Sequence, residues 1–252
     1  MGDDALDRDA RIKLSIGTKL HGYADGQFAN PRGLAFDHHR GLLLVVDSFN
    51  HRVQVFSCDD GSLVSKLGEE GNQPGQFKYP CGLAIDHDHD RILIVDSSNN
   101  RIQSWPLSKQ SFLSCIGQYG SGDLEFYEPR GIAIDKHHHR IIIVDRYNDR
   151  MVFLSIDPSF LCKIGGKEGD QPGEFCRPSG IAIDDDRHRI IVCDTFNHRV
   201  QVLSSIDGSF LFEFGEEGDQ PCQLDSPQGL CIANQGRIIV ADTSNRRLQS
   251  FT

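Results

Sequence analysis

The feature that most constrains the fold of this chain is an internal repeat of 49 residues. The phrases PRGLAFD, PCGLAID, PRGIAID, PSGIAID and PQGLCIA begin at Pro31, Pro80, Pro129, Pro178 and Pro227. After each phrase comes an apolar run that ends in an aspartate, in the first four repeats always at the same distance from the proline. In the last repeat this distance is one residue shorter. Such a period is typical of propellers and solenoids, in which each unit buries its apolar faces against its neighbours.

Each repeat predicts four short strands. Residues 33–37 (GLAFD) form a small apolar run opened by Pro-x-Gly, which suits a crowded inner position. Residues 91–96 (RILIVD) are continuously apolar and β-branched, as in a strand that is covered on both faces. Residues 53–56 (VQVF) alternate between apolar and polar residues, as in a half-buried strand, and residues 112–117 (FLSCIG) supply a fourth strand. The pattern predicts an all-β fold, namely a closed β-propeller of five four-stranded blades.

The two ends of the chain have complementary patterns. The last repeat stops one strand short of a blade, at residues 248–251 (LQSF), whereas residues 12–17 (IKLSIG) resemble FLSCIG. We therefore expect the N-terminal strand to complete the last blade and to remove exposed strand edges. The alternative is six blades, one of them outside this sequence. The predicted domains are an acidic tail at residues 1–10 and a propeller at residues 11–252.

Charge and composition limit the partners. The net charge of −10 disfavours a nucleic-acid partner held mainly through phosphates. The longest apolar runs are far shorter than the roughly 20 residues that span a bilayer, and the acidic N-terminus has no apolar signal region, so we expect no membrane partner. Eight cysteines without a CxxC pair favour reduced thiols and a cytoplasmic location. We expect a monomeric ring.

The repeated phrases resemble a known family. Pro-x-Gly-[Leu/Ile]-Ala-[Ile/Phe]-Asp, the apolar strand ending in Val-Asp, and the turn Asp-x-x-Asn-x-Arg are similar to NHL repeats, over about residues 12–252. The resemblance extends to the NHL domains of tripartite-motif proteins, which are mostly six-bladed. It implies a binding platform that, in a larger chain, would be the substrate-recognition domain of a ubiquitin-ligase-like protein.

Three polar residue types recur in every turn after the apolar strand. Catalysis needs one convergent set of residues, and five equivalent sets do not converge, so we interpret them as structural. Asp and Asn side chains shape turns, and each Arg is expected to pair with an Asp of its own or an adjacent blade. These structural turn residues are Asp47, Asn50, Arg52, Asp96, Asn99, Arg101, Asp145, Asn148, Arg150, Asp194, Asn197, Arg199, Asp242, Asn245 and Arg247.

The positions before and after the Asn vary from turn to turn, so they could carry function. These turns share a propeller face with the loops that lead into each inner strand, and aromatic residues among polar ones suit a protein or peptide partner. The alternative is that the aromatic residues pack between blades. The candidate binding residues are Phe49, His51, Asn100, Tyr147, Asp149, Phe196, His198 and Arg246.

Two further functions follow from the resemblance. NHL domains of tripartite-motif proteins can bind RNA through basic and aromatic residues on this face. In this chain Arg146, Lys167 and Arg246 would be the basic residues, although the Glu and Asp of neighbouring loops weaken the positive charge of the face. Related propellers include a zinc-dependent peptide-amidating lyase and calcium-dependent lactonases, which makes a metal-dependent enzyme the second alternative. Because the inner strands begin with glycine and continue with apolar residues, we expect no catalytic residue, no enzymatic activity and no cofactor.

Histidines and aspartates gather in the hairpins between the first and second strands. His38, His39, His87 and His89 are examples, and imidazole and carboxylate are metal-ligand groups. Tips of different blades are expected to point away from one another, and no single tip offers four ligands in tetrahedral spacing. We therefore expect no metal site, with His137, His138 and His139 as weak candidates.

Overall fold

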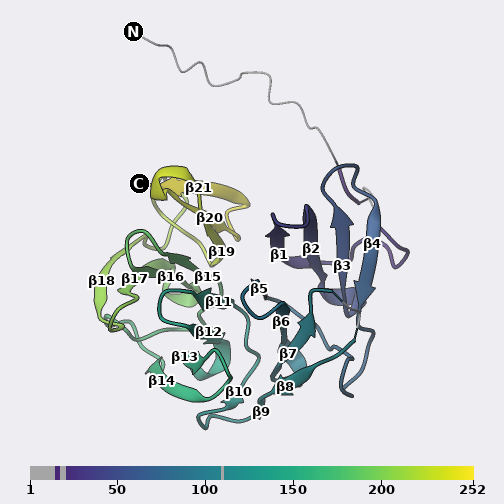
Figure 1. The fold of residues 1–252 in the computed structure, drawn as a ribbon. Coiled ribbons are helices and arrows are strands. Elements are labelled where there is room, and N and C mark those ends of the chain that lie inside the picture. Colours follow the sequence, from purple (N-terminus) through teal and green to yellow (C-terminus); the bar gives the residue numbers. More distant parts are fainter. Residues whose placement is uncertain (1–14, 18–20, 109–110) are drawn as a thin grey trace.

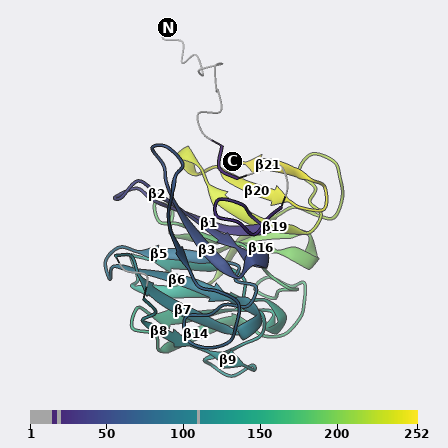
Figure 2. The same ribbon diagram turned by 90° about the vertical axis from the view of Figure 1, so that its right-hand side faces the viewer.

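The computed structural model describes residues 15–17, 21–108 and 111–252, which form an all-β propeller of five blades. Figure 1 looks along the axis, around which the innermost strands of the blades are arranged in chain order. Figure 2 shows the propeller from the side on which the first two blades lie. The prediction of a five-bladed all-β propeller is confirmed, and the expected acidic tail at residues 1–10 lies outside the described residues.

Each of the first four blades is an antiparallel sheet of four strands in chain order. The first two blades contain β1 (Pro31–Asp37), β2 (Leu42–Asp47), β3 (Arg52–Ser57), β4 (Leu63–Leu67), β5 (Leu83–Asp86), β6 (Arg91–Asp96), β7 (Arg101–Pro106) and β8 (Ser114–Ile116). The next two contain β11 (Ile132–Asp135), β12 (Arg140–Asp145), β13 (Arg150–Ser155), β14 (Phe160–Gly165), β15 (Ile181–Asp184), β16 (Arg189–Asp194), β17 (Arg199–Ser204) and β18 (Phe210–Phe214).

The fifth blade has three strands in the described part of the chain, β19 (Pro227–Ile232), β20 (Ile238–Asp242) and β21 (Arg247–Phe251). A small parallel pair, β9 (Gln118–Tyr119) with β10 (Glu125–Phe126), lies in the loop between the second and third blades. Single 3₁₀ turns are η1 (Ser48–Asn50), η2 (Ser97–Asn99), η3 (Arg146–Asn148), η4 (Thr195–Asn197) and η5 (Asn234–Gly236). None of these described helical segments has the length or apolarity to cross a membrane.

In the first four blades the glycine of the Pro-x-Gly phrase lets neighbouring inner strands approach closely, whereas a Cβ atom at Gly229 of the fifth blade would meet only Ala241 of its own blade, at 3.7 Å. A Cβ atom at Gly33 would lie 2.4 Å from the carbonyl oxygen of Cys81 in the next blade, and one at Gly131 would lie 2.4 Å from that of Ser179. Both distances are shorter than any real carbon–oxygen contact. The repeat therefore has glycine here because a side chain would push the blades apart.

The apolar core is divided among the contacts between blades. Successive residues of a strand point to opposite faces of its sheet. The second strand of a blade can therefore pack on the preceding blade with one face and on the following blade with the other. Four apolar clusters lie between consecutive blades from the first to the fifth. The continuously apolar strands predicted from the sequence are these second strands, which are buried from both sides.

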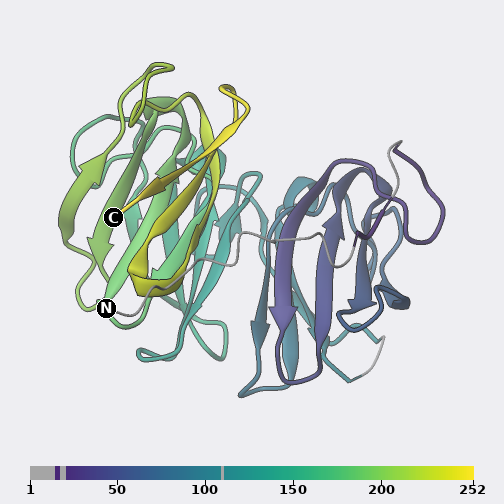
Figure 3. The same ribbon diagram turned by 90° about the horizontal axis from the view of Figure 1, so that it is seen from above.

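The contact between the fifth blade and the first is different. The described residues form no apolar cluster there, and Figures 1 and 3 show the β19–β21 and β1–β4 sheets standing apart. Leu34, Phe36 and Leu248 are exposed on the two faces concerned. The closing strand predicted at residues 12–17 lies outside the described residues for 12–14, and residues 15–17 belong to no strand. Closure by this segment stays a prediction.

Candidate binding site on the turn face

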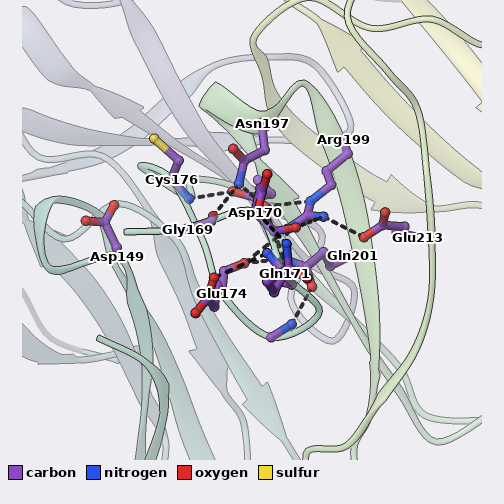
Figure 4. A network of polar contacts seen from close by, with 12 residues as sticks. Asp149, Gly169, Asp170, Gln171, Glu174, Cys176, Asn197, Arg199, Gln201 and Glu213 are labelled. Atoms are coloured by element: carbon purple, nitrogen blue, oxygen red, sulfur yellow. Dashed lines mark hydrogen bonds and ion pairs between the residues drawn. The ribbon is translucent and has the colours of Figure 1, made fainter. Parts of the chain in front are cut away.

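The turn between the second and third strands of each blade is organised by a buried aspartate, as the fourth blade illustrates (Figure 4). Asp194 accepts a hydrogen bond from the Cys176 backbone N–H at 2.8 Å. Its other oxygen accepts from Asn197 at 2.8 Å, from Arg199 Nε at 2.9 Å and from Gln201 at 3.1 Å. One carboxylate therefore fixes the turn, the third strand and the preceding loop, and all of its bonds come from buried or half-buried donors.

The guanidinium of the same turn ties down the loop that precedes the inner strand. Arg199 donates to the backbone carbonyls of Asp170 at 2.6 Å, Gln171 at 3.3 Å and Glu174 at 3.2 Å, and it pairs with Glu213 on β18 at 2.7 Å. Every blade repeats the pairing of this arginine with the aspartate of its own turn. The other pairs are Arg52–Asp47 at 2.8 Å, Arg101–Asp96 at 2.7 Å, Arg150–Asp145 at 2.8 Å and Arg247–Asp242 at 2.6 Å. Asn50, Asn99, Asn148 and Asn245 donate to the same four aspartates.

The residue after the Asn has a left-handed backbone and contacts the next blade. Its φ angle is 54° at His51 and 49° at Asp149. Its side chain accepts a hydrogen bond from the backbone N–H of the residue before the next Pro-x-Gly phrase. These contacts are His51 Nδ1 with Tyr79 at 3.2 Å, Asn100 Oδ1 with Glu128 at 2.8 Å, Asp149 Oδ1 with Arg177 at 2.7 Å, and His198 Nδ1 with Ser226 at 3.3 Å.

This contact gives four of the predicted binding residues a structural role, while their part in binding stays a prediction. His51, Asn100, Asp149 and His198 use their acceptors to join adjacent blades, and none of them is fully exposed. Burial raises the pKa of Asp149, as expected for a carboxylate enclosed between two blades. Arg246, which has the same place in the last blade, is exposed. The position varies in residue type because the fold needs only a hydrogen-bond acceptor there.

Aromatic side chains are the exposed part of the turn face. Phe49 and Phe196 are 51% and 43% exposed, and Tyr147 is half-buried. Phe49 stacks edge-on with Tyr79 at 5.6 Å between ring centroids, and Tyr127 lies 4.9 Å from Tyr147. The aromatic residues therefore meet across blade boundaries while part of each ring stays accessible. Such rings supply contact area at a small cost in side-chain entropy.

Two arginines cover the aromatic pair of the third and fourth blades. The guanidinium of Arg177 lies 4.7 Å from the ring centroid of Phe196 and 5.2 Å from that of Tyr147. The guanidinium of Arg146 lies 5.9 Å and 5.4 Å from the same two rings. These distances are within the range of cation–π attraction, which holds both charges against the rings.

Arg32 and Arg130 extend this basic group to the mouth of the central cavity. Together with Arg146 and Arg177 they form what we call the rim arginines. None of the four has a carboxylate partner within ion-pair distance among the described residues, and the Nε atoms of Arg130 and Arg146 are buried without a hydrogen-bond partner there. Buried polar groups normally have partners, so these two guanidinium groups call for an explanation.

The rim arginines also repel one another. Burial lowers the pKa of Arg130, and the charges of Arg146 and Arg32 lower it further, although Cys81 and Glu128 act in the opposite direction. Burial lowers the pKa of Arg146 as well, and Arg177 and Arg32 add to the effect, while Tyr147 and Glu128 oppose it. In both cases the charged form of the guanidinium is destabilised by its surroundings. An anion placed among these side chains would stabilise all four.

The central cavity that the rim arginines border has a volume of about 550 Å³. Its wall consists mainly of the glycines and apolar residues of the inner strands, with Cys81, Ser179, Cys231 and Thr243 among them. No histidine, aspartate or glutamate of the described chain lines it. The cavity therefore offers a basic mouth above an apolar wall and no acid–base pair.

The remaining sequence-predicted residues lie elsewhere. Lys167 is exposed in the loop after β14 and belongs to none of the cation–π contacts of the rim arginines. On the opposite face, which we call the hairpin face, His138 Nδ1 lies 2.9 Å from Asp135, and the His137 ring lies 5.8 Å from that of His188. His139 has a left-handed backbone at the hairpin tip. The weak metal candidates therefore do not converge on one point.

Comparisons with known proteins place this geometry in a fold family. A family model described as a 6-bladed β-propeller matches residues 35–118, and the NHL repeat model matches residues 175–203 and 224–251. No curated protein matches the chain in sequence.

Three of the solved structures similar to this one are lyases. A streptogramin B lyase is 14% identical with a TM-score of 0.63, over 88% of this chain and 68% of the other. A virginiamycin B lyase from Staphylococcus aureus is 14% identical with a TM-score of 0.62, over 88% and 69%. Its catalytically inactive variant with quinupristin is 12% identical with a TM-score of 0.63, over 88% and 70%. At these identities the likeness concerns the fold alone.

Proposed function

Because this chain is an NHL-repeat β-propeller, we propose that it is a non-catalytic binding platform whose turn face holds an acidic, aromatic-containing protein or peptide segment. One observation carries the proposal: Arg146 and Arg177 lie over Tyr147 and Phe196, the charges of Arg32 and Arg130 lie close by, and none of the four has a carboxylate within ion-pair distance among the described residues. The cation–π contacts offset only part of the cost, because burial and mutual repulsion still destabilise the charged forms of Arg130 and Arg146. A partner that brings carboxylates or phosphates to the rim arginines would remove that penalty.

The surroundings of the rim arginines favour a protein partner. Tyr147 and Phe196 present partly exposed rings between the guanidinium groups, and aromatic residues and arginines are the residues that dominate the energetics of protein interfaces. Acidic residues such as Glu69 and Glu70 lie further out on the same face. A ring of negative charge around a basic centre would direct a short acidic segment to the rim and disfavour a long polyanion.

Single-stranded RNA is the second candidate. Arginines stacked on aromatic rings are the surface on which unpaired bases also stack, and the rim arginines would contact phosphates. The net charge of −10 opposes this reading. A lyase activity has no comparable support, since the wall of the cavity lacks histidine and carboxylate groups in the described chain.

The eight cysteines bear on the compartment in which such a platform works. All eight are unpaired, and four of them, Cys58, Cys81, Cys176 and Cys193, are buried or half-buried. Burial raises the pKa of the Cys176 thiol to about 12, which keeps it protonated and unreactive. These thiols support the proposal of a reducing, cytoplasmic location.

Selection from a display library of random peptides tests the proposed function. We expect the immobilised protein to enrich peptides that combine glutamate or aspartate with an aromatic residue. Addition of such a peptide in solution should displace the selected phage. A library that yields no enriched sequence, or only basic sequences, would contradict the proposal.

Fluorescence anisotropy with mixed single-stranded RNA, at low and at physiological salt, separates the second candidate from the first. Phosphate-dominated binding strengthens steeply as the salt concentration falls. Failure to bind RNA even at low salt eliminates the RNA reading, whereas RNA binding that outcompetes the selected peptides would replace the peptide proposal.

A further inference from the structure

The hairpins of the first two blades meet on the hairpin face, opposite the rim arginines. The β1–β2 hairpin carries His38 and His39, and the β5–β6 hairpin carries His87. The His39 and His87 rings lie 4.3 Å apart between centroids, and His38 lies 5.3 Å from His87. The expectation that hairpin tips of different blades point away from one another is therefore wrong at this boundary, because His87 leans toward the preceding blade.

A buried carboxylate completes the group. Asp37 ends β1 and is fully buried, and its Oδ1 atom lies 4.0 Å from Nε2 of His87. One ligand atom from each of Asp37, His39 and His87 lies within 4.8 Å of the other two. Two atoms that share one tetrahedral zinc ion at about 2.0–2.2 Å lie about 3.4 Å apart, so binding requires the exposed His39 ring to rotate and the His87 ring to move toward Asp37 by about half an ångström.

The carboxylate is already oriented by its own hairpin. Asp37 accepts hydrogen bonds from the backbone N–H groups of His39 at 3.0 Å and Arg40 at 3.2 Å. The guanidinium of Arg40 holds the other carboxylate oxygen at 3.2 Å and is itself paired with Asp90 at 2.7 Å. Partners of this kind fix the orientation of a ligand and are typical of the surroundings of bound metals.

The repeat does not require this group. At the place of His87 the next two blades have Lys136 and Asp185. In those blades the buried aspartate that ends the inner strand is paired inside its own hairpin, as Asp135 is with His138 at 2.9 Å and Asp184 is with Arg187 at 3.4 Å, but among the described residues only Asp37 also has a histidine of the next blade within 4.0 Å. The three-residue group thus belongs to one blade boundary of the described chain, and the packing of the propeller does not explain it.

We propose that Asp37, His39 and His87 form a binding site for a divalent transition metal ion, with zinc the best fit. Two imidazoles and one carboxylate are a donor set that zinc takes in proteins, whereas an all-oxygen set would favour magnesium or calcium. The His38 ring lies 4.5 Å from that of His39 and borders the fourth position. The site is separate from the turn face and does not depend on the function proposed there.

Titration of the purified, chelator-treated protein with Zn²⁺ tests the site by calorimetry. We expect one Zn²⁺ per chain in the wild type. His39→Ala should weaken binding at least about tenfold, because even residues that only support a ligand contribute about 10–100-fold to metal affinity. His39 is exposed, so this substitution leaves the core intact. His87→Gln should weaken binding similarly.

His89→Ala is the matched control, since it removes an exposed imidazole of the same two hairpins that is paired with Asp86. This variant should bind Zn²⁺ like the wild type. Absorption spectra with Co²⁺ in place of Zn²⁺ should show d–d bands without the near-ultraviolet band of a cobalt–thiolate bond. No binding by the wild type, equal binding by His39→Ala, or a thiolate band would each overturn the proposal.

Discussion

Two buried arginines of one turn show how differently the molecule uses the same side chain. Arg150 is 2% exposed, pairs with Asp145 at 2.8 Å and donates to the carbonyls of Ser121, Gly122 and Glu125, each at 2.8 Å. Arg146 is 8% exposed and has no hydrogen-bond partner for its Nε atom among the described residues. The first arginine holds the blade together, while the second is kept buried at a cost in stability.

The difference extends over the whole turn face. The outer part of that face consists of five similar networks in which every arginine is paired with its own aspartate. The rim of the central cavity consists of arginines that repel one another and rest on aromatic rings. The comparison teaches that the residues recurring in every blade form the networks of the turns, whereas the rim arginines occur in only some blades and have no carboxylate within ion-pair distance in the described chain.

The largest effect on the free energy of unfolding should come from replacing Arg150, the arginine that is paired with Asp145. Arg150→Met removes four hydrogen bonds and leaves the Asp145 carboxylate buried with fewer partners, so the free energy of unfolding should fall by about 3–5 kcal/mol. Urea denaturation monitored by circular dichroism measures it. A loss below about 1 kcal/mol would show that the networks are not what stabilises the blades.

Replacing the acid of a network should have the next largest effect. Asp194→Asn keeps the size of the side chain but leaves the buried guanidinium of Arg199 with only Glu213 as an anionic partner. The free energy of unfolding should fall by about 2–3 kcal/mol. Asp157→Ala, at an exposed aspartate without a side-chain partner in the described chain, is the control and should change stability by less than about 0.5 kcal/mol. Equal effects of the two substitutions would contradict the role assigned to Asp194.

Replacing a rim arginine should not lower the free energy of unfolding in the way that replacing a paired arginine does. Arg146→Met replaces a buried, unpaired charge with an apolar side chain of similar length, so stability should stay within about 1 kcal/mol of the wild type or rise. The same urea experiment compares it directly with Arg150→Met. If the two variants lose stability equally, the distinction between paired and rim arginines fails.

The smallest effect concerns anions in solution. Inorganic phosphate should raise the melting temperature of the wild type more than sodium chloride of equal ionic strength, because an anion bound at the rim arginines stabilises the folded state. This additional rise in melting temperature with phosphate should be smaller in Arg146→Met. It should be unchanged in Arg187→Ala, which removes an arginine on the hairpin face. An additional rise that is the same in all three proteins would point to binding elsewhere.

Much of the fold could be predicted from the sequence because the same physical requirement recurs five times. The glycine after Pro-x is repeated since each inner strand of the first four blades touches the next, and Asp, Asn and Arg are repeated since every turn uses one carboxylate in the same way. At His51 and His198 the sequence predicted binding and did not reveal the hydrogen bond to the next blade, because several residue types supply the acceptor at this position.

Of the rim arginines, the sequence indicated only Arg146, and the other three could not be predicted from local patterns. Arg32 and Arg130 occupy the middle of Pro-x-Gly, where other blades have Cys81, Ser179 and Gln228, and Arg177 precedes a proline. Only the curvature of the ring brings these separate positions to one place. The same holds for the group of Asp37, His39 and His87, whose members are 50 residues apart at most and meet because His87 reaches across a blade boundary.

The most direct test of the central claim is the affinity of a selected acidic peptide for Arg177→Ala relative to the wild type. Arg177 is exposed and unpaired, so its removal should leave stability unchanged but weaken peptide binding at least about tenfold. Arg187→Ala, with the same loss of charge on the other face, should bind like the wild type. Equal dissociation constants for Arg177→Ala and the wild type would contradict the assignment of the turn face as the binding site.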